Sequence, residues 1–214
     1  MRPRIAWANP PMHLAFAAAF LGGLGLFAGD PTLPAGVRVA AEGAAWLLCV
    51  RGKGLVAVPA VLAAVVLPLS GHASGAGAVS VDALHVLSAA MWGGGILALV
   101  TLRPPEGWRS AEARRLVERF GRVAVIAFGI TALTGFFRAT EQLNEVSQLW
   151  TTTYGVVLAL KVAAVLLLVA WSTAWRRGWA PAWAEGALAV LILLLTAVLA
   201  AIPPPPLVEA GIAF

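Results

Sequence analysis

Two histidines, His72 and His85, lie thirteen residues apart, where one apolar run ends and the next begins. Imidazole nitrogens bind Cu(I), Cu(II) and Zn(II), whereas the thioether of methionine selects Cu(I). His85 lies inside an apolar run of membrane-spanning length, and an ionisable residue in such a position is by default a hypothesis for a functional site. The two imidazoles therefore predict a metal site, which water, Asp82 or a second chain would complete.

The residues that follow His85 bear on how it is held. Ser88 and Trp92 share its helix face by the three-and-four spacing. The run Gly93-Gly94-Gly95 leaves a flat surface against which another helix can pack closely. A structural alternative is that His85 hydrogen-bonds a neighbouring helix and His72 is an ordinary loop residue. The spacing alone leaves both interpretations open.

Three charged residues interrupt other apolar runs: Arg38, Glu42 and Lys161. An ammonium group at the depth of Lys161 should face the bundle interior or a wet cavity and find a partner. Arg38 and Glu42 are four residues apart and share one helix face. We therefore predict an intramembrane polar cluster of Lys161, Glu42 and Arg38, in which Glu42 pairs with Lys161. The cluster either holds the bundle together or lines a path.

Another group of polar residues lies toward the end of the apolar run 120–137. Arg138 and Glu141 are three residues apart and are expected to pair locally. Thr131 and Thr134 share a face with Arg138, and their hydroxyls are expected to bond the backbone or a neighbouring helix.

The composition defines the fold class. The 214-residue chain is 60% hydrophobic and only 12% charged, with a mean hydropathy of +0.87, whereas soluble domains carry about 25% charged residues. A spanning helix needs about 20 apolar residues, and the chain has six or seven runs near that length. We predict an all-α, polytopic integral membrane bundle that forms a single domain, 1–214. The alternating segments of a membrane β-barrel are missing from the sequence.

Seven helices are predicted, and the second is the least certain. Residues 37–50 are few and include Arg38 and Glu42, so the count is six if this segment lies on the surface. Residues 106–119 read as an amphipathic segment on the cytoplasmic surface, after Pro104 and Pro105. The predicted helices cover residues 12–28, 37–50, 54–69, 81–102, 120–137, 154–175 and 183–202.

The charge pattern predicts the orientation. Cytoplasmic loops collect Lys and Arg, and every basic loop falls on one side if residues 37–50 span the membrane. This arrangement puts the N-terminus in the cytoplasm and the C-terminus in the periplasm. The net charge of +5 thus reflects topology, and we expect no nucleic-acid partner. The lone Cys49 excludes an intrachain disulfide. Without a nucleotide-binding loop or a Ser/His/Asp group, we expect neither an enzyme nor an ATP-driven pump.

Several short motifs occur in an order that resembles the copper resistance protein D (CopD) family of bacterial inner-membrane proteins. The resemblance covers about residues 69–204. Its motifs are Gly71-His72-Ala73, the run from Asp82 to Gly95, Arg119-Phe120-Gly121-Arg122, Thr134-Gly135, Thr153-Tyr154-Gly155 with Lys161, and Leu195-Thr196-Ala197 leading to Pro203-Pro204.

The resemblance implies copper transport or delivery across the inner membrane, beside a periplasmic copper-binding partner. Carried over to this chain, it points to His85 first and to His72 second as copper ligands. Because the chain has no Met-rich or His-rich periplasmic segment, we expect modest copper affinity from this chain alone, with lipid around it and a second copy as a further partner.

Two other functions compete with copper transport. A haem-binding electron-transfer protein would place axial histidines on facing helices, and a Soret band would reveal it. A membrane assembly subunit without transport activity would leave the cellular copper content unchanged on deletion.

Overall fold

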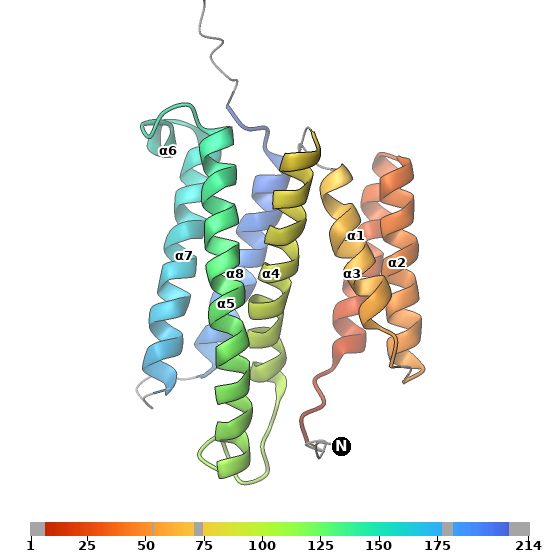
Figure 1. Cartoon of the computed structure of the whole chain (residues 1–214), viewed down its shortest axis with the longest axis vertical. Helices are drawn as coiled ribbons and strands as arrows, with labels where there is room; N and C mark the ends of the chain where they lie inside the picture. Colours follow the sequence, from red (N-terminus) through yellow and green to blue (C-terminus); the bar gives the residue numbers. More distant parts are fainter. Residues whose placement is uncertain (1–6, 53, 71–74, 177–181, 206–214) are drawn as a thin grey trace, which may run out of the picture. The chain divides into compact units, whose positions relative to one another are not determined.

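The computed structural model describes residues 7–52, 54–70, 75–176 and 182–205. The described residues form helices and turns without a strand, which confirms the all-α prediction. Six helices are long and apolar enough to cross a membrane, and a shorter apolar helix covers Ala57–Leu69. The elements in Figure 1 are α1 (Met12–Gly29), α2 (Leu33–Val50), α3 (Ala57–Val66), η1 (Leu67–Ser70), α4 (Ala76–Thr101), α5 (Ala111–Gln142), α6 (Gln148–Thr151), α7 (Thr153–Arg176) and α8 (Ala182–Ala201).

Side-chain caps define the start of several helices. Thr32 accepts the backbone N–H of Ala35 at the start of α2, at 3.4 Å, and Pro34 lies in its first turn. Ser110 accepts the N–H of Ala113 at the start of α5, at 3.3 Å. Such caps satisfy backbone donors that have no partner within the helix. Polar residues thus cap the starts of α2 and α5, whereas α1, α3 and α4 begin without a side-chain cap.

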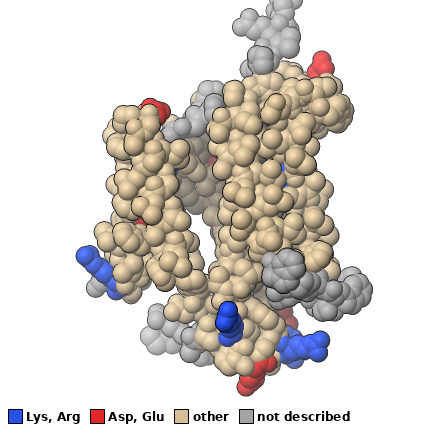
Figure 2. Space-filling view, turned by 180° about the vertical axis from the view of Figure 1, so that it is seen from behind, with Lys and Arg blue, Asp and Glu red and all other residues tan. Residues whose placement is uncertain are grey.

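Large apolar side chains lie exposed along the helices, as they would when facing lipid. Examples are Leu21, Ile126, Leu166 and Leu194, each at least 60% exposed. In Figure 2, the blue and red atoms lie mostly toward the helix ends, and the surface between them is tan. A water-soluble monomer does not expose apolar surface on this scale. This distribution fits helices that are surrounded by hydrocarbon.

Helix packing divides the chain into two compact units, Met1–Thr134 and Gly135–Phe214. In the first unit, α2 packs against α1 and α3, and α3 packs against α4. In the second unit, α7 packs against α6 and α8. The prediction of a single domain over residues 1–214 stays a prediction.

A contact within the first unit links the start of α1 to the connection between α4 and α5. The Trp7 indole Nε1–H donates to Glu112 Oε2 at 2.7 Å, and the Trp7 and Trp108 rings meet edge to face, 6.5 Å apart. These two points therefore lie on the same side of the membrane, so an even number of crossings separates them. α1, α2 and α4 supply three crossings. An even number is reached when α3 also spans, as the prediction of seven helices requires.

Four helices differ from the predicted ranges. α4 begins at Ala76, five residues before its predicted start. α2 begins at Leu33 and has 18 residues, about 27 Å at 1.5 Å per residue, so its length no longer argues against spanning. The short element is α3 instead, and a short span is accommodated by local thinning of the bilayer. The segment predicted as a separate surface helix joins α5 from Ala111 onward, because residues 111–120 contain neither glycine nor proline to interrupt it.

The second unit shows what Gly155 of the Thr153-Tyr154-Gly155 motif does at the start of α7, together with Thr152 just before the motif. Thr152 Oγ1 accepts the Gly155 N–H at 3.0 Å and donates to the Gln148 carbonyl oxygen at 2.7 Å. Gly155 packs directly against the backbone of α6, and a Cβ at this position would overlap the Gln148 carbonyl oxygen. The glycine is therefore required by close packing, and the motif positions α6 against α7.

We predict that Gly155→Ala will lower the thermal unfolding midpoint of the detergent-solubilised protein, because backbone atoms of α6 must move to admit the methyl group. The control is Gly129→Ala in α5, where a Cβ meets nothing within 4 Å. That change should be neutral or should stabilise by about 0.5–1 kcal/mol through helix propensity. Equal midpoints for the two variants would contradict this account of the motif.

Candidate metal-binding site

A chain of polar side chains joins α4 to α5 in the first unit. Thr131 Oγ1 accepts the Trp92 indole N–H at 3.0 Å and lies 2.8 Å from Ser88 Oγ. The Ser88 hydroxyl donates in turn to the Leu84 carbonyl oxygen at 2.7 Å. Ser88 and Trp92 are both buried. The shared face predicted for Ser88 and Trp92, and the interhelical bonding predicted for Thr131, are confirmed. We call Ser88, Trp92, Thr131, His85 and Thr134 the polar seam.

His85 lies at one end of the polar seam. Its Nδ1 is 3.0 Å from Oγ1 of Thr134, which is buried on α5. Contact with a neighbouring helix was the structural alternative for His85, and the structure contains it. The contact involves Nδ1, so it leaves the assignment of His85 as a metal ligand through its other ring nitrogen untested. Thr134 was not predicted as the partner of His85, although the sequence identified its hydroxyl as an interhelical donor or acceptor.

The hydrogen bonds of Thr134 indicate which ring nitrogen of His85 holds the proton. A threonine hydroxyl has one proton, and the Ile130 carbonyl oxygen accepts it at 2.7 Å. With this proton on the backbone, Thr134 Oγ1 would accept from His85, and a neutral ring would then hold its proton on Nδ1. The lone pair of the neutral imidazole is then on Nε2. A metal-binding histidine commonly donates its other ring N–H in this way, which fixes its tautomer and orientation.

The other donors predicted for this site are described only in part. His72 lies outside the described residues. Asp82 is half-buried and precedes His85 by one helical turn. Among the residues that the structure describes, no group of three or more His, Cys, Asp and Glu side chains is placed to hold a metal ion. The described residues of this chain thus supply an incomplete ligand set around His85.

Of the three glycines predicted to admit a neighbouring helix, Gly95 alone is in close contact. A Cβ at Gly95 would overlap the Phe120 ring of α5, whereas at Gly93 and Gly94 it would meet nothing within 4 Å. Gly95 therefore leaves room on α4 for the Phe120 ring of α5.

The predicted polar cluster is observed for two of its three members. Arg38 Nε lies 3.6 Å from Glu42 Oε1 within α2. Glu42 packs against Gly23 of α1, where a Cβ would overlap its carboxylate. Lys161 belongs to the second unit, so its pairing with Glu42 stays a prediction. The first two charges therefore form a local pair within one helix.

Lys161 is half-buried on α7. The residues three and seven positions beyond it, Ala164 and Leu168, are buried, as is Tyr154, seven positions before it. Residues at these spacings share one helix face. Lys161 thus lies on the packed face of α7, and neighbouring Leu160 and Val162 lie on its exposed surface.

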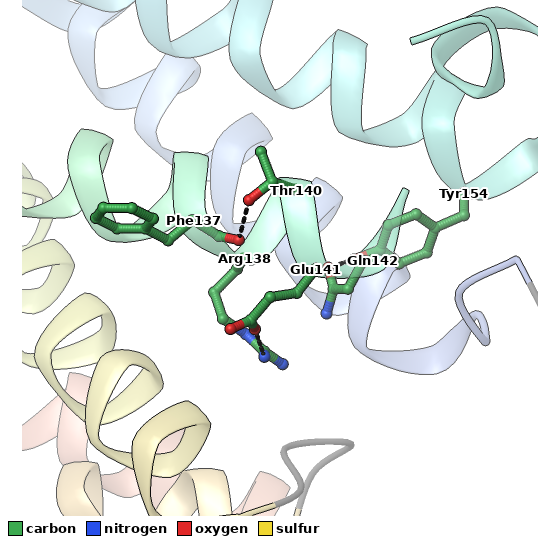
Figure 3. Close-up of polar contacts among 6 residues, drawn as sticks. All are labelled: Phe137, Arg138, Thr140, Glu141, Gln142 and Tyr154. Carbon is green, nitrogen blue, oxygen red and sulfur yellow. Dashed lines mark hydrogen bonds and ion pairs between the residues drawn. The ribbon is translucent and has the colours of Figure 1, made fainter. Parts of the chain in front are cut away.

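The end of α5 in the second unit contains a further polar group (Figure 3). Arg138 and Glu141 form an ion pair, which confirms the predicted local pairing. The Thr140 hydroxyl donates to the Phe137 carbonyl oxygen at 2.8 Å, and the Tyr154 hydroxyl donates to Gln142 Oε1. The last contact ties the start of α7 to the end of α5. These bonds have a structural role at a helix end.

The fold is that of a polytopic helical membrane protein, in which several polar side chains bond between helices. Residues 114–202 match the family model of copper resistance protein D, which confirms the predicted resemblance over this segment. The matched segment includes Thr131, Thr134 and Lys161 but not His85.

A curated relative gives a second comparison. The copper transport protein CutJ of Bacillus subtilis (strain 168) is 31% identical over 140 residues, which are 60% of this chain and 26% of CutJ. The match thus spans about a quarter of the length of that relative. No solved structure matches the chain significantly.

We predict that Thr131→Val will destabilise the solubilised protein by about 1–2 kcal/mol, because it leaves the buried Trp92 N–H without its acceptor. Thr173→Val is the matched control, since the Thr173 hydroxyl bonds only the Val169 carbonyl oxygen of its own helix. Thermal unfolding in detergent measures both changes. If Thr131→Val proved as mild as Thr173→Val, the polar seam would not contribute to stability.

Proposed function

We propose that this chain carries copper across, or delivers it at, a bacterial inner membrane, without ATP hydrolysis. The copper ion is the cargo. The matched family is named for copper resistance and the relative for copper transport, and both support this proposal. Within the chain, the single observation that carries it is the orientation of His85, whose Nδ1 is held by Thr134 at 3.0 Å.

The polar seam would prepare His85 for copper in two ways. Thr134 fixes the ring through Nδ1, so that Nε2 presents the lone pair that a metal requires. Ser88 and Thr131, each about one turn away, join the two helices that carry this pair. His72, from the link before α4, is the proposed second ligand. Copper would then move on through ligand exchange, because two imidazoles alone bind it weakly.

An incomplete ligand set favours a partner. A protein that passes copper onward needs sites from which the ion can leave, so we propose that a periplasmic copper-binding protein or a second copy of this chain supplies the remaining ligands. His72 and His85 would meet it at the periplasmic end of the bundle.

Copper analysis of the purified full chain tests this function. His85→Ala should remove most of the bound copper, because it deletes the oriented ligand, and His72→Ala should remove less. His13→Ala is the control. His13 is exposed near the start of α1, on the side of the membrane predicted to be cytoplasmic, so its loss should leave the copper content unchanged. Binding needs neutral imidazole, so copper should also be lost on acidification below about pH 6.5, the ordinary pKa of free histidine.

Two results would contradict the proposal. Full copper loading of the His85→Ala variant would exclude the site, and a Soret band in the visible spectrum would favour the haem-binding alternative.

The orientation is tested separately. We propose a cytoplasmic N-terminus and a periplasmic C-terminus, because this arrangement puts the basic connection between α4 and α5 inside. A periplasm-dependent reporter fused after Phe214 should be active. Activity of a cytoplasm-dependent reporter at the same position would reverse the topology.

A further inference from the structure

A partly open cavity of about 150 Å³ lies among the first three helices, within the first unit. Arg38 and Glu42 of α2 line it, together with Phe16 of α1. Small side chains of α3 leave the space open, namely Ala60, Ala63 and Ala64. Because these residues lie in the interiors of apolar helices, the cavity lies at membrane depth. It involves none of the residues of the polar seam.

Two buried polar atoms of the cavity residues make no hydrogen bond to any described residue: Arg38 Nε and Glu42 Oε2. The Arg38 side chain is 7% exposed and that of Glu42 is 15% exposed. Their mutual contact, 3.6 Å to the other carboxylate oxygen, is longer than a hydrogen bond. A buried donor or acceptor without a partner is costly, and in hydrocarbon no solvent offsets that cost.

We propose that this cavity binds water, which bridges the Arg38 Nε–H to Glu42 Oε2. Water both donates and accepts, so it satisfies the two atoms together. A lipid acyl chain would satisfy neither. The charges of Arg38 and Glu42 cancel within one helical turn, so the cavity has no net attraction for an anion or for a cation. The volume is ample, since a single water needs about 10–15 Å³ of such space.

Water in this cavity would complete the hydrogen bonds of the Arg38–Glu42 pair, which the neighbouring helices do not complete. α1, α3 and η1 pack against α2, and their described residues offer the pair no charged side chain, because His13 near the start of α1 is the only titratable residue among them. Gly23 keeps the Glu42 carboxylate beside α1, since any Cβ there would overlap it. No described side chain of the first unit completes the hydrogen bonds of both groups, so water is the partner that we propose.

Radiolytic hydroxyl labelling of the wild-type chain in lipid nanodiscs tests the proposal, because the radicals form from water in place. Phe16 lines the cavity, whereas Phe20, one turn further along α1 and also half-buried, stacks on Trp46 and does not line it. Phe16 should be oxidised several-fold faster than Phe20. The excess should disappear in the double variant Arg38→Leu with Glu42→Leu.

Equal oxidation of Phe16 and Phe20 in the wild type would mean that the cavity is dry or filled by lipid, and would overturn the proposal even if the double variant does not fold. An undiminished excess in a folded double variant would also overturn it, since water would then not be held by Arg38 and Glu42. Neither outcome bears on copper binding at His85.

Discussion

The requirement that polar groups inside a membrane find partners within the protein governs this structure. Thr131 shows the solution most clearly, because its hydroxyl accepts from Trp92 and bonds Ser88, all at the contact between α4 and α5. On the same two helices, Gly95 of α4 leaves room for the Phe120 ring of α5. His85 is held by the same contact through Thr134. The polar seam therefore links helix packing to the orientation of His85 on α4.

Arg38 and Glu42 meet the same requirement differently. Their ion pair is long, and each retains an atom without a hydrogen bond to the described protein. The polar seam satisfies its groups through side chains of the opposing helix, whereas the pair in α2 borders a cavity. Lys161, half-buried on the packed face of α7, is a third charge under the same constraint.

Hydropathy predicted the helices because the lipid environment imposes length and apolarity on each span. Helix ends were harder: the Arg-rich first turns of α5 read as a surface segment, although nothing in 111–120 breaks a helix. At the site, helical spacing placed His85, Ser88 and Trp92 on one face. It could not pair His85 with Thr134, because that contact joins residues 49 positions apart and depends on how α4 and α5 pack. The position of His72 lies outside the described residues.

X-ray absorption at the copper edge of the copper-loaded full chain tests the central claim most directly. It reports which atoms surround the metal, so a role for the oriented imidazole is visible without a transport assay. We predict imidazole scattering in the wild type and in His13→Ala, and its loss or marked reduction in His85→Ala. An unchanged spectrum in His85→Ala, or a wild-type spectrum dominated by sulfur, would contradict the assignment of His85 as the copper ligand.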